Sequence, residues 1–197
     1  MIGLFDEKDL LDEGQKRFID YQLPETELKL WERFFEKEES DFYYQVFLQT
    51  TPWAQHRRKM YERIVADPRL TAWYGNNGNE WTPELLRIKE KVEDCCGISF
   101  DGVLLNYYRD GNDSVAWHCD NPPPSGKHHS IASVTFGETR VFKIRHKQQK
   151  QFNQIEIPLT HGSFLLMGER MQEFYEHHIP KTSRQIGPRI NLTFRKS

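Results

Sequence analysis

Cysteine is scarce in this 197-residue chain, and the three present (Cys95, Cys96 and Cys119) include an adjacent pair and make an odd total. This argues against a disulfide framework, and the absence of a Cys-x-x-Cys pair argues against zinc ribbons and thioredoxin-like redox motifs. Long apolar runs are also missing, since even the run 164–167 is far too short to cross a bilayer. The acidic N-terminus has no apolar stretch typical of a signal peptide, so we expect a cytoplasmic protein with no membrane partner.

Neither sign of charge dominates overall, but the charges are unevenly distributed. The net charge is −2, and 37% hydrophobic with 28% charged residues is typical of a globular protein. Residues 1–50 carry 13 acidic and 6 basic side chains, whereas residues 140–197 carry 11 basic and 4 acidic ones. The basic half suits a phosphate-bearing partner. Alternatively, the two ends neutralise each other in the fold, and charge alone does not decide between these interpretations.

Two segments in the N-terminal half of the chain have helical patterns. Residues 24–39 place Leu28, Trp31 and Phe35 on one stripe. A second helix is expected from Pro83, with Thr82 as its N-terminal cap and Gly97 at its end. The length is sufficient for one domain with a sizeable core and marginal for two.

After Gly97 the sequence changes to short β-type runs separated by turn residues. The expected strands cover residues 103–108, 115–120, 131–136, 140–145, 154–159, 163–167, 173–177 and 190–195. Short strands with this punctuation are typical of a sandwich or a jelly roll, against one side of which the helices would pack.

His118 and Asp120 stand at the end of one expected strand and share a face, because residues two apart in a strand point the same way. An imidazole and a carboxylate make two thirds of the 2-His-1-carboxylate set that holds non-haem iron(II). Taken alone, the pair is a weak signal, and a hydrogen-bonded pair on the surface is its more usual explanation. The remaining candidates for a second histidine ligand are His128, His129, His146, His161, His177 and His178, and residue type excludes none of them. His177 and His178 would point to opposite faces of a strand, so only one of them could be a ligand.

The C-terminal strand alternates perfectly between polar and apolar residues. Its polar face carries Arg189, Asn191, Thr193 and Arg195. Guanidinium pairs with carboxylate in a two-pronged fork, so this face could bind a dicarboxylate; a solvent-facing strand is the alternative. Asn106 and Tyr108 share a face of another expected strand, and each offers a donor to an anion.

Residues from about 69 to 196 resemble the AlkB family of Fe(II)/2-oxoglutarate-dependent alkylation-repair dioxygenases. The matching stretches agree in order and spacing, and they cover residues 106–111, 118–120, 131–137, 145–147, 161–163 and 188–195. The last of them, PRINLTFR, is highly specific, whereas the first 68 residues resemble the family only weakly.

The resemblance implies an α+β fold with a double-stranded β-helix (jelly-roll) core flanked by N-terminal helices. Residues 1–197 would then form a single dioxygenase domain. Within it, residues 1–68 would be an N-terminal helical, substrate-side extension and residues 98–197 the jelly-roll catalytic core.

The resemblance also implies the ligands of the site. It makes His118, Asp120 and His177 the catalytic iron(II) ligands, with His177 identified by the x-x-Pro that follows it. Arg189 would bind the distal carboxylate of 2-oxoglutarate, and Arg195 would lie near its metal-bound end. O₂ is the second cosubstrate. The full set of implied cosubstrate residues is Asn106, Tyr108, Arg189, Asn191 and Arg195.

The implied reaction is oxidative dealkylation of N-alkylated nucleic-acid bases in DNA repair, with release of formaldehyde, succinate and CO₂. The base must be flipped or already unpaired. We expect DNA as the substrate in preference to RNA, and a monomeric protein. Trp73 or Tyr74 could stack on the base, although either could equally belong to the core. Phosphate contacts could come from the basic residues at 57–59, or from Lys143, Arg145 and Lys147.

One position departs from the family pattern. Asn121 follows His-x-Asp where family members usually have an acidic residue, and it is the third expected substrate-binding residue. An amide carries no charge, so this change weakens the expectation of a preference for positively charged methylated bases. The alternatives are an Fe(II)/2-oxoglutarate oxygenase acting on a protein or small molecule and, third, a nucleic-acid binder with an inactive site.

Overall fold

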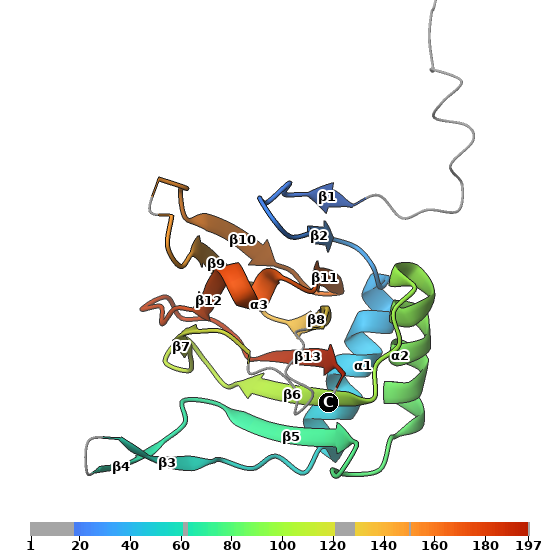
Figure 1. The fold of residues 1–197 in the computed structure, drawn as a ribbon. Helices are drawn as coiled ribbons and strands as arrows, with labels where there is room; N and C mark the ends of the chain where they lie inside the picture. The colour runs from blue at the N-terminus through green and yellow to red at the C-terminus, as the bar shows by residue number, and fades with distance from the viewer. Residues whose placement is uncertain (1–17, 61–62, 121–128, 150, 197) are drawn as a thin grey trace, which may run out of the picture.

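The computed structural model describes residues 18–60, 63–120, 129–149 and 151–196. Within these ranges two antiparallel sheets dominate the architecture, and three helices and a separate hairpin accompany them (Figure 1). None of the described helices is long and apolar enough to cross a membrane.

The major sheet has seven strands in the order β1-β2-β11-β8-β13-β6-β5. Their bounds are β1 Ile19–Asp20, β2 Leu28–Trp31, β11 Ser163–Met167, β8 Ile131–Gly137, β13 Arg189–Arg195, β6 Gly102–Tyr108 and β5 Leu70–Gly75. The minor sheet has the order β10-β9-β12-β7. Its strands are β10 Ile155–Leu159, β9 Arg140–His146, β12 Tyr175–Ile179 and β7 Val115–His118. The hairpin is formed by β3 (Arg57–Met60) and β4 (Arg63–Ala66).

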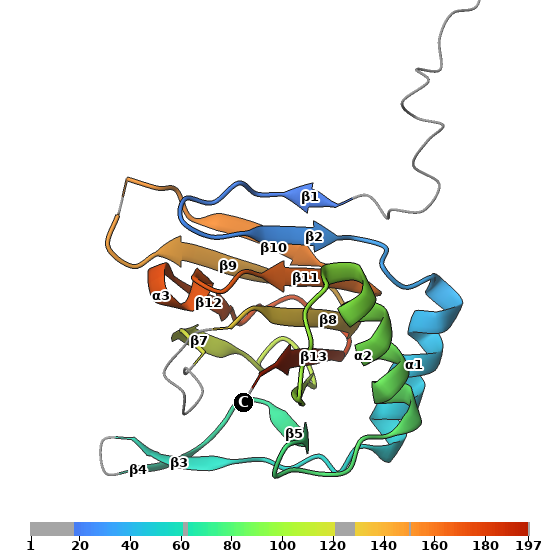
Figure 2. The ribbon, with the colours of Figure 1, turned by 45° about the vertical axis from the view of Figure 1, so that its right-hand side comes forward.

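Helices α1 (Lys37–Thr50) and α2 (Pro83–Cys96) cover the outer face of the major sheet (Figure 2). Phe47 of α1 and Ile88 of α2 share one core cluster with the apolar side chains of β13, namely Ile190, Leu192 and Phe194. The apolar face of β13 is therefore fixed against the helices. Its polar face must then point between the two sheets, because successive side chains of a strand alternate.

A second apolar cluster fills the space between the sheets. It joins Ile131 and Leu165 of the major sheet to Phe142 and Ile144 of the minor sheet. The two antiparallel sheets packed face to face form a jelly roll, which confirms the predicted fold class. The short helix α3 (Met171–Phe174) leads directly into β12.

All eight expected strands are present, with small shifts at their ends. The helix expected from Pro83 is also confirmed: Thr82 Oγ1 accepts a hydrogen bond from the Leu85 N–H at 3.3 Å, and Gly97 ends the helix with φ 69°. Both caps depend on residues close together in the sequence, so sequence spacing is sufficient to predict them.

The prediction of a helix over residues 24–39 is wrong. Residues 28–31 form β2, which pairs with β11, and α1 begins only at Lys37. Leu28 and Leu30 enter the cluster between the sheets, whereas Trp31 packs on the helix side. Tertiary pairing therefore overrides the helical spacing. Strands β1, β2 and β5 of the major sheet precede residue 98, and the first 68 residues contain strands as well as α1.

Candidate metal centre and adjoining cavity

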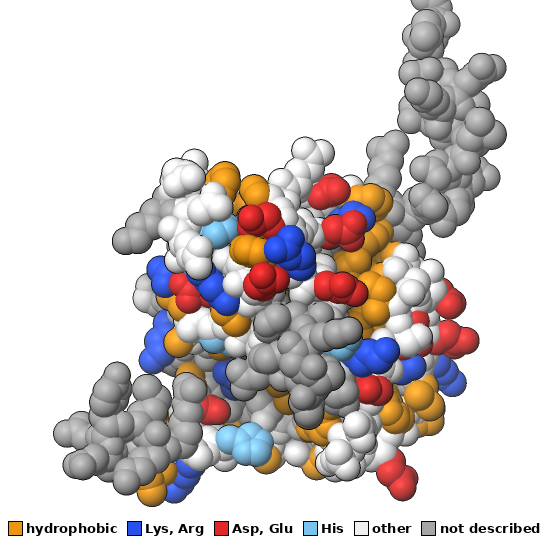
Figure 3. Space-filling model, in the orientation of Figure 1, with side chains coloured by type: hydrophobic (Ala, Val, Ile, Leu, Met, Phe, Trp, Pro, Cys, Tyr) orange, Lys and Arg blue, Asp and Glu red, His pale blue; other side chains and the backbone are white. Residues whose placement is uncertain are grey.

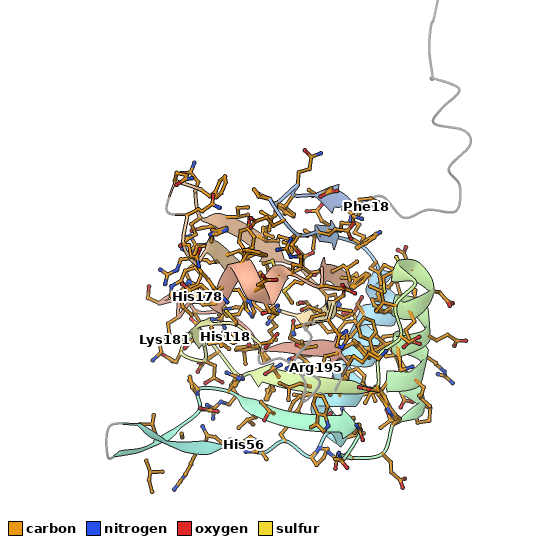
Figure 4. All side chains as sticks on the ribbon, in the orientation of Figure 1. Phe18, His56, His118, His178, Lys181 and Arg195 are labelled. Carbon is orange, nitrogen blue, oxygen red and sulfur yellow. The ribbon has the colours of Figure 1, made fainter. Side chains whose placement is uncertain are left out.

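A cavity opens between the two sheets at the end of the inner apolar cluster. The major sheet contributes the polar faces of β6 and β13, and the minor sheet contributes parts of β7, β9 and β12. Figure 4 labels His118 and Arg195, which approach the cavity from the minor and major sheets, respectively. The polar residues that line the cavity are Arg69, Asn106, Tyr108, His118, Asp120, Ser133, His177, Arg189, Asn191, Thr193 and Arg195.

Three potential metal ligands converge on one point of this cavity. His118 ends β7 and is paired in register with His177 of β12, while Asp120 lies two residues beyond β7. The ring centroids of the two histidines are 4.4 Å apart. One ligand atom from each of His118, Asp120 and His177 lies within 4.8 Å of the others. The sequence prediction placed these three residues together, and the strand pairing explains how they meet.

The protonation of the three side chains suits metal binding. His118 Nδ1 lies 2.8 Å from the Ala116 carbonyl oxygen, which can only accept, so Nδ1 carries a proton and Nε2 is the ring nitrogen left to bind a metal. Burial lowers the pKa of His177 to about 4, so its ring is neutral at neutral pH. Burial alone would raise the pKa of Asp120, but the positive charge of Arg195 and the neighbouring histidines hold it below the usual range. The site thus offers a carboxylate, the neutral ring of His177 and the Nε2 atom of His118.

This donor set fits iron(II), for which two histidines and one carboxylate on one side of the ion are characteristic. One ligand atom of each residue lies within 4.8 Å of the others, so the three side chains are close enough to bind one ion. The residues present therefore fit an iron(II) ion.

Neighbouring groups hold the segment that carries Asp120. Its backbone N–H donates to Gln172 Oε1 at 2.9 Å, and the Cys119 thiol donates to the Tyr175 carbonyl at 3.3 Å. Arg195 approaches the Asp120 carboxylate from the other sheet at 3.5 Å. Sequence reasoning missed Gln172, because no local pattern indicates that a residue of α3 reaches this segment.

Arg189 is the most deeply buried cation of the cavity, with 1% of its surface exposed. Its Nη2 donates to Thr135 Oγ1 at 2.9 Å and to Asn191 Oδ1 at 2.6 Å, while its Nε has no partner within the described ranges. Burial lowers its pKa to about 10, so it remains charged at neutral pH. No acidic side chain of the described residues forms an ion pair with it. An unpaired buried cation favours an anionic ligand, and guanidinium fits a carboxylate such as that of 2-oxoglutarate.

A row of polar side chains surrounds Arg189. Ser133 Oγ donates to Asn191 Oδ1 at 3.0 Å, and Asn191 Nδ2 donates to Thr193 Oγ1 at 2.9 Å. Ser133 and Thr135 were missed, although their alternation within an otherwise apolar strand is a usable signal. Arg69 was also missed; its Nε donates to Asn106 Oδ1 at 2.8 Å.

Two of the expected substrate residues, Trp73 and Tyr74, lie outside the cavity. Tyr74 is 4% exposed and belongs to the core beneath the helices, which corrects its assignment to a substrate pocket. Trp73 is on the other face of β5, where it lies against Gly102 and donates through Nε1 to the Asn76 carbonyl. Neither residue lines the cavity. Asn121 lies outside the described residues.

The cations of β9 and of the residue after it, which were expected to bind phosphate, already have partners within the protein. Arg145 pairs with Glu176 at 2.6 Å, Lys143 pairs with Glu156, and Lys147 donates to the Gln172 carbonyl at 2.7 Å. These contacts favour a structural role for the β9 cations. In the hairpin, Arg57 is exposed.

Sequence comparisons identify related proteins. A family model described as the 2OG-Fe(II) oxygenase superfamily matches residues 27–195. The alpha-ketoglutarate-dependent dioxygenase alkB homolog 3 of Bos taurus is 36% identical over 180 residues, which are 82% of this chain and 63% of that protein. The DNA oxidative demethylase ALKBH2 of Homo sapiens is 35% identical over 147 residues, or 66% of this chain and 56% of that protein. The chain thus spans a little under two thirds of the first of these relatives.

Solved structures share the fold. The structure of OsALKBH1 superposes with a TM-score of 0.67 at 14% identity, covering 92% of this chain and 100% of that one. A prolyl hydroxylase in complex with a hypoxia inducible factor oxygen degradation domain peptide fragment from Trichoplax adhaerens gives a TM-score of 0.62 at 11% identity, covering 86% and 83%. At these identities the likeness concerns the jelly-roll fold.

Proposed function

The chain belongs to the 2OG-Fe(II) oxygenase superfamily and, within it, to the AlkB family, and from that premise we propose that it is an iron(II)- and 2-oxoglutarate-dependent dioxygenase that removes alkyl groups from nucleic-acid bases. One observation carries the proposal. A cluster of two histidines and one aspartate shares a cavity with a buried arginine that lacks an anionic partner among the described residues. The histidines and the aspartate thus suit the metal, and the arginine suits the keto acid.

The protonation of the three ligands would favour metal binding. His118, Asp120 and His177 would bind iron(II), which together with 2-oxoglutarate and O₂ supplies the oxidising power to hydroxylate the carbon attached to the base nitrogen. The Ala116 carbonyl fixes the tautomer of His118, and Arg195 keeps Asp120 ionised. A hydroxylated methyl group then leaves as formaldehyde, while the keto acid becomes succinate and CO₂.

The cosubstrate would lie along the polar face of β13. Arg189 would pair with its distal carboxylate, because this guanidinium is buried and already oriented by Thr135 and Asn191. Tyr108 lies beside it, with its ring centroid 5.2 Å from the guanidinium carbon. Fixed donors position the keto acid and exclude water, which is the protein's part in such chemistry.

Nucleic acid is the proposed substrate because of the relatives. One of them is named a DNA oxidative demethylase, and the other an alkB homolog. A base must leave a duplex stack to enter a cavity between two sheets, so single-stranded or flipped bases in DNA are the expected form. Asn121, in place of the usual acid, leaves the choice among alkylated bases open.

The test is a panel of single- and double-stranded oligonucleotides, each with one methylated base, incubated with iron(II), 2-oxoglutarate and O₂. Mass spectrometry of the bases and a succinate assay give two independent readouts, and an Asp120→Ala variant is the inactive control. We expect succinate and repaired base in equal amounts. Succinate without base conversion would reject a nucleic-acid substrate in favour of a protein or small molecule. The absence of both would reject the dioxygenase.

A further inference from the structure

A second cleft adjoins the metal cavity at the edge of the minor sheet. Its floor and walls come from the start of β7, the end of β12 and the segment before β5. Arg69, Val115 and Ile179 line both the cleft and the metal cavity, so the two spaces are neighbours. Figure 4 shows His178 and Lys181 of the cleft close to the metal ligand His118.

The cleft is cationic. Arg69 and Lys181 contribute two positive charges, and no acidic side chain is among the described residues that line the cleft. Neither cation forms an ion pair with an acidic side chain of the described ranges. Lys143 and Arg145, on β9 of the same sheet, both pair with glutamates. Figure 3 shows Lys and Arg side chains, with Asp or Glu side chains among them, along the left edge of the molecule, where Figure 1 places β7, β9 and β12. Thus the cleft, unlike β9, has positive charge available for a ligand.

The polar groups of the cleft are held in place. Arg69 donates through Nε to Asn106 Oδ1 at 2.8 Å, which fixes the plane of the guanidinium. His178 stacks on Trp117 at a centroid distance of 3.9 Å. A fixed guanidinium and an ammonium suit the several acceptor oxygens of a phosphate.

We propose that this cleft binds a backbone phosphate of the nucleic-acid strand whose base enters the metal cavity. The identity of the strand rests on the proposed function. A nucleotide carries its phosphates on the sugar, outside the base, so a phosphodiester is the anion that reaches a neighbouring cleft while the base is in the cavity. Such a contact fixes position and carries no base information.

Binding of an unmodified, fluorescein-labelled single-stranded DNA, measured by fluorescence anisotropy over a range of KCl concentrations, tests the proposal. Lys181→Ala should weaken binding and lower the log–log salt slope by about one, because one fewer phosphate is neutralised. Arg33→Ala is the matched control: Arg33 is an exposed cation between β2 and α1, on the helix side of the molecule, and its loss should change neither quantity.

Catalysis supplies a second comparison. With a methylated oligonucleotide, Lys181→Ala should raise KM several-fold and leave kcat unchanged. With the corresponding methylated nucleoside, which has no phosphate, both constants should match those of the unsubstituted protein. Equal affinities and slopes for Lys181→Ala and Arg33→Ala would overturn the cleft assignment even if base repair is observed. A reduced slope without base repair would support the cleft while rejecting the proposed reaction.

Discussion

The two faces of β12 offer contrasting chemistry from adjacent residues. His177 points inward, is 5% exposed and lies beside His118 and Asp120. His178 points outward, stacks on Trp117 and lies near charged side chains of β9. On the inner face, polar atoms such as His177 Nδ1 lack partners among the described residues. On the outer face, the β9 cations are paired with glutamates.

This difference separates groups that the fold satisfies by itself from groups that favour a ligand. A charge paired at the surface contributes little to stability, about 0–1 kcal/mol, and can be lost cheaply. A buried group without a partner costs free energy until something binds it. The inner face of β12 and the polar face of β13 have this second property. The following predictions test the contrast, from the largest expected effect to the smallest.

His177→Ala should abolish turnover, because it removes one of three ligands on the inner face. Iron content of the purified protein and succinate formation provide the measurements, and circular dichroism checks that the variant is folded. Retention of both iron and turnover would exclude His177 as a ligand and return the choice to another histidine.

Arg189→Met should remove the response to 2-oxoglutarate. The unsubstituted protein, with iron(II) and without O₂, should gain about 2.7 kcal/mol of stability at a cosubstrate concentration of 100 Kd. The variant should gain nothing at that concentration. Without the keto acid its stability should change little, because the relief of burying an unpaired cation offsets the lost hydrogen bonds.

Thermal denaturation with and without 2-oxoglutarate measures this effect. Arg145→Met is the control from the outer face, since it also removes an arginine and should keep the full response. If Arg189→Met is stabilised by 2-oxoglutarate as much as this control, Arg189 does not bind the keto acid.

The metal-free protein should lose stability as the pH falls from 6.5 to about 4. Burial places the pKa of folded His177 at about 4, below the ordinary value of 6.5. Above pH 6.5 the residue is neutral in both states and has no effect. Between the two values only the unfolded chain binds the proton, so the free energy of unfolding falls by up to about 3 kcal/mol, and the loss levels off below pH 4.

Denaturant unfolding at several pH values, in the presence of a chelator, tests this behaviour. His177→Gln should flatten the pH dependence in that range. The pKa of His178 is lowered as well, but this residue is half-buried, so His178→Gln should flatten it less. Parallel curves for the original chain and His177→Gln would contradict the assignment.

His178→Ala should have the smallest effect and leave much of the turnover. The variant loses the stacking contact with Trp117, which is worth about 0.5–1.5 kcal/mol for an aromatic pair. Initial rates of succinate formation, compared with those of His177→Ala, give the sharpest single test of the contrast. Equal loss of turnover in the two variants would contradict the assignment of His177, and not His178, as the metal ligand of β12.

Sequence spacing predicted the strands well, because strand alternation is a local property, whereas His177 was singled out as a ligand only by the family resemblance. Arg189, Asn191, Thr193 and Arg195 alternate with apolar residues, and all four line the cavity. The helix predicted over residues 24–39 failed because pairing with β11 decides that segment. Tyr74 could not be assigned to core or pocket, since that depends on which face of β5 the helices cover.

The sequence by itself determined which side chains share a strand face and which residue types could hold a metal and a carboxylate. Only the tertiary structure decided that His118 and His177 meet across β7 and β12, that Gln172 supports Asp120, and that Arg69 joins two neighbouring cavities. The physical reason is the distance along the chain over which each effect acts. Alternation follows from backbone geometry within a few residues, whereas convergence of distant segments depends on which strands pair and on how the two sheets pack.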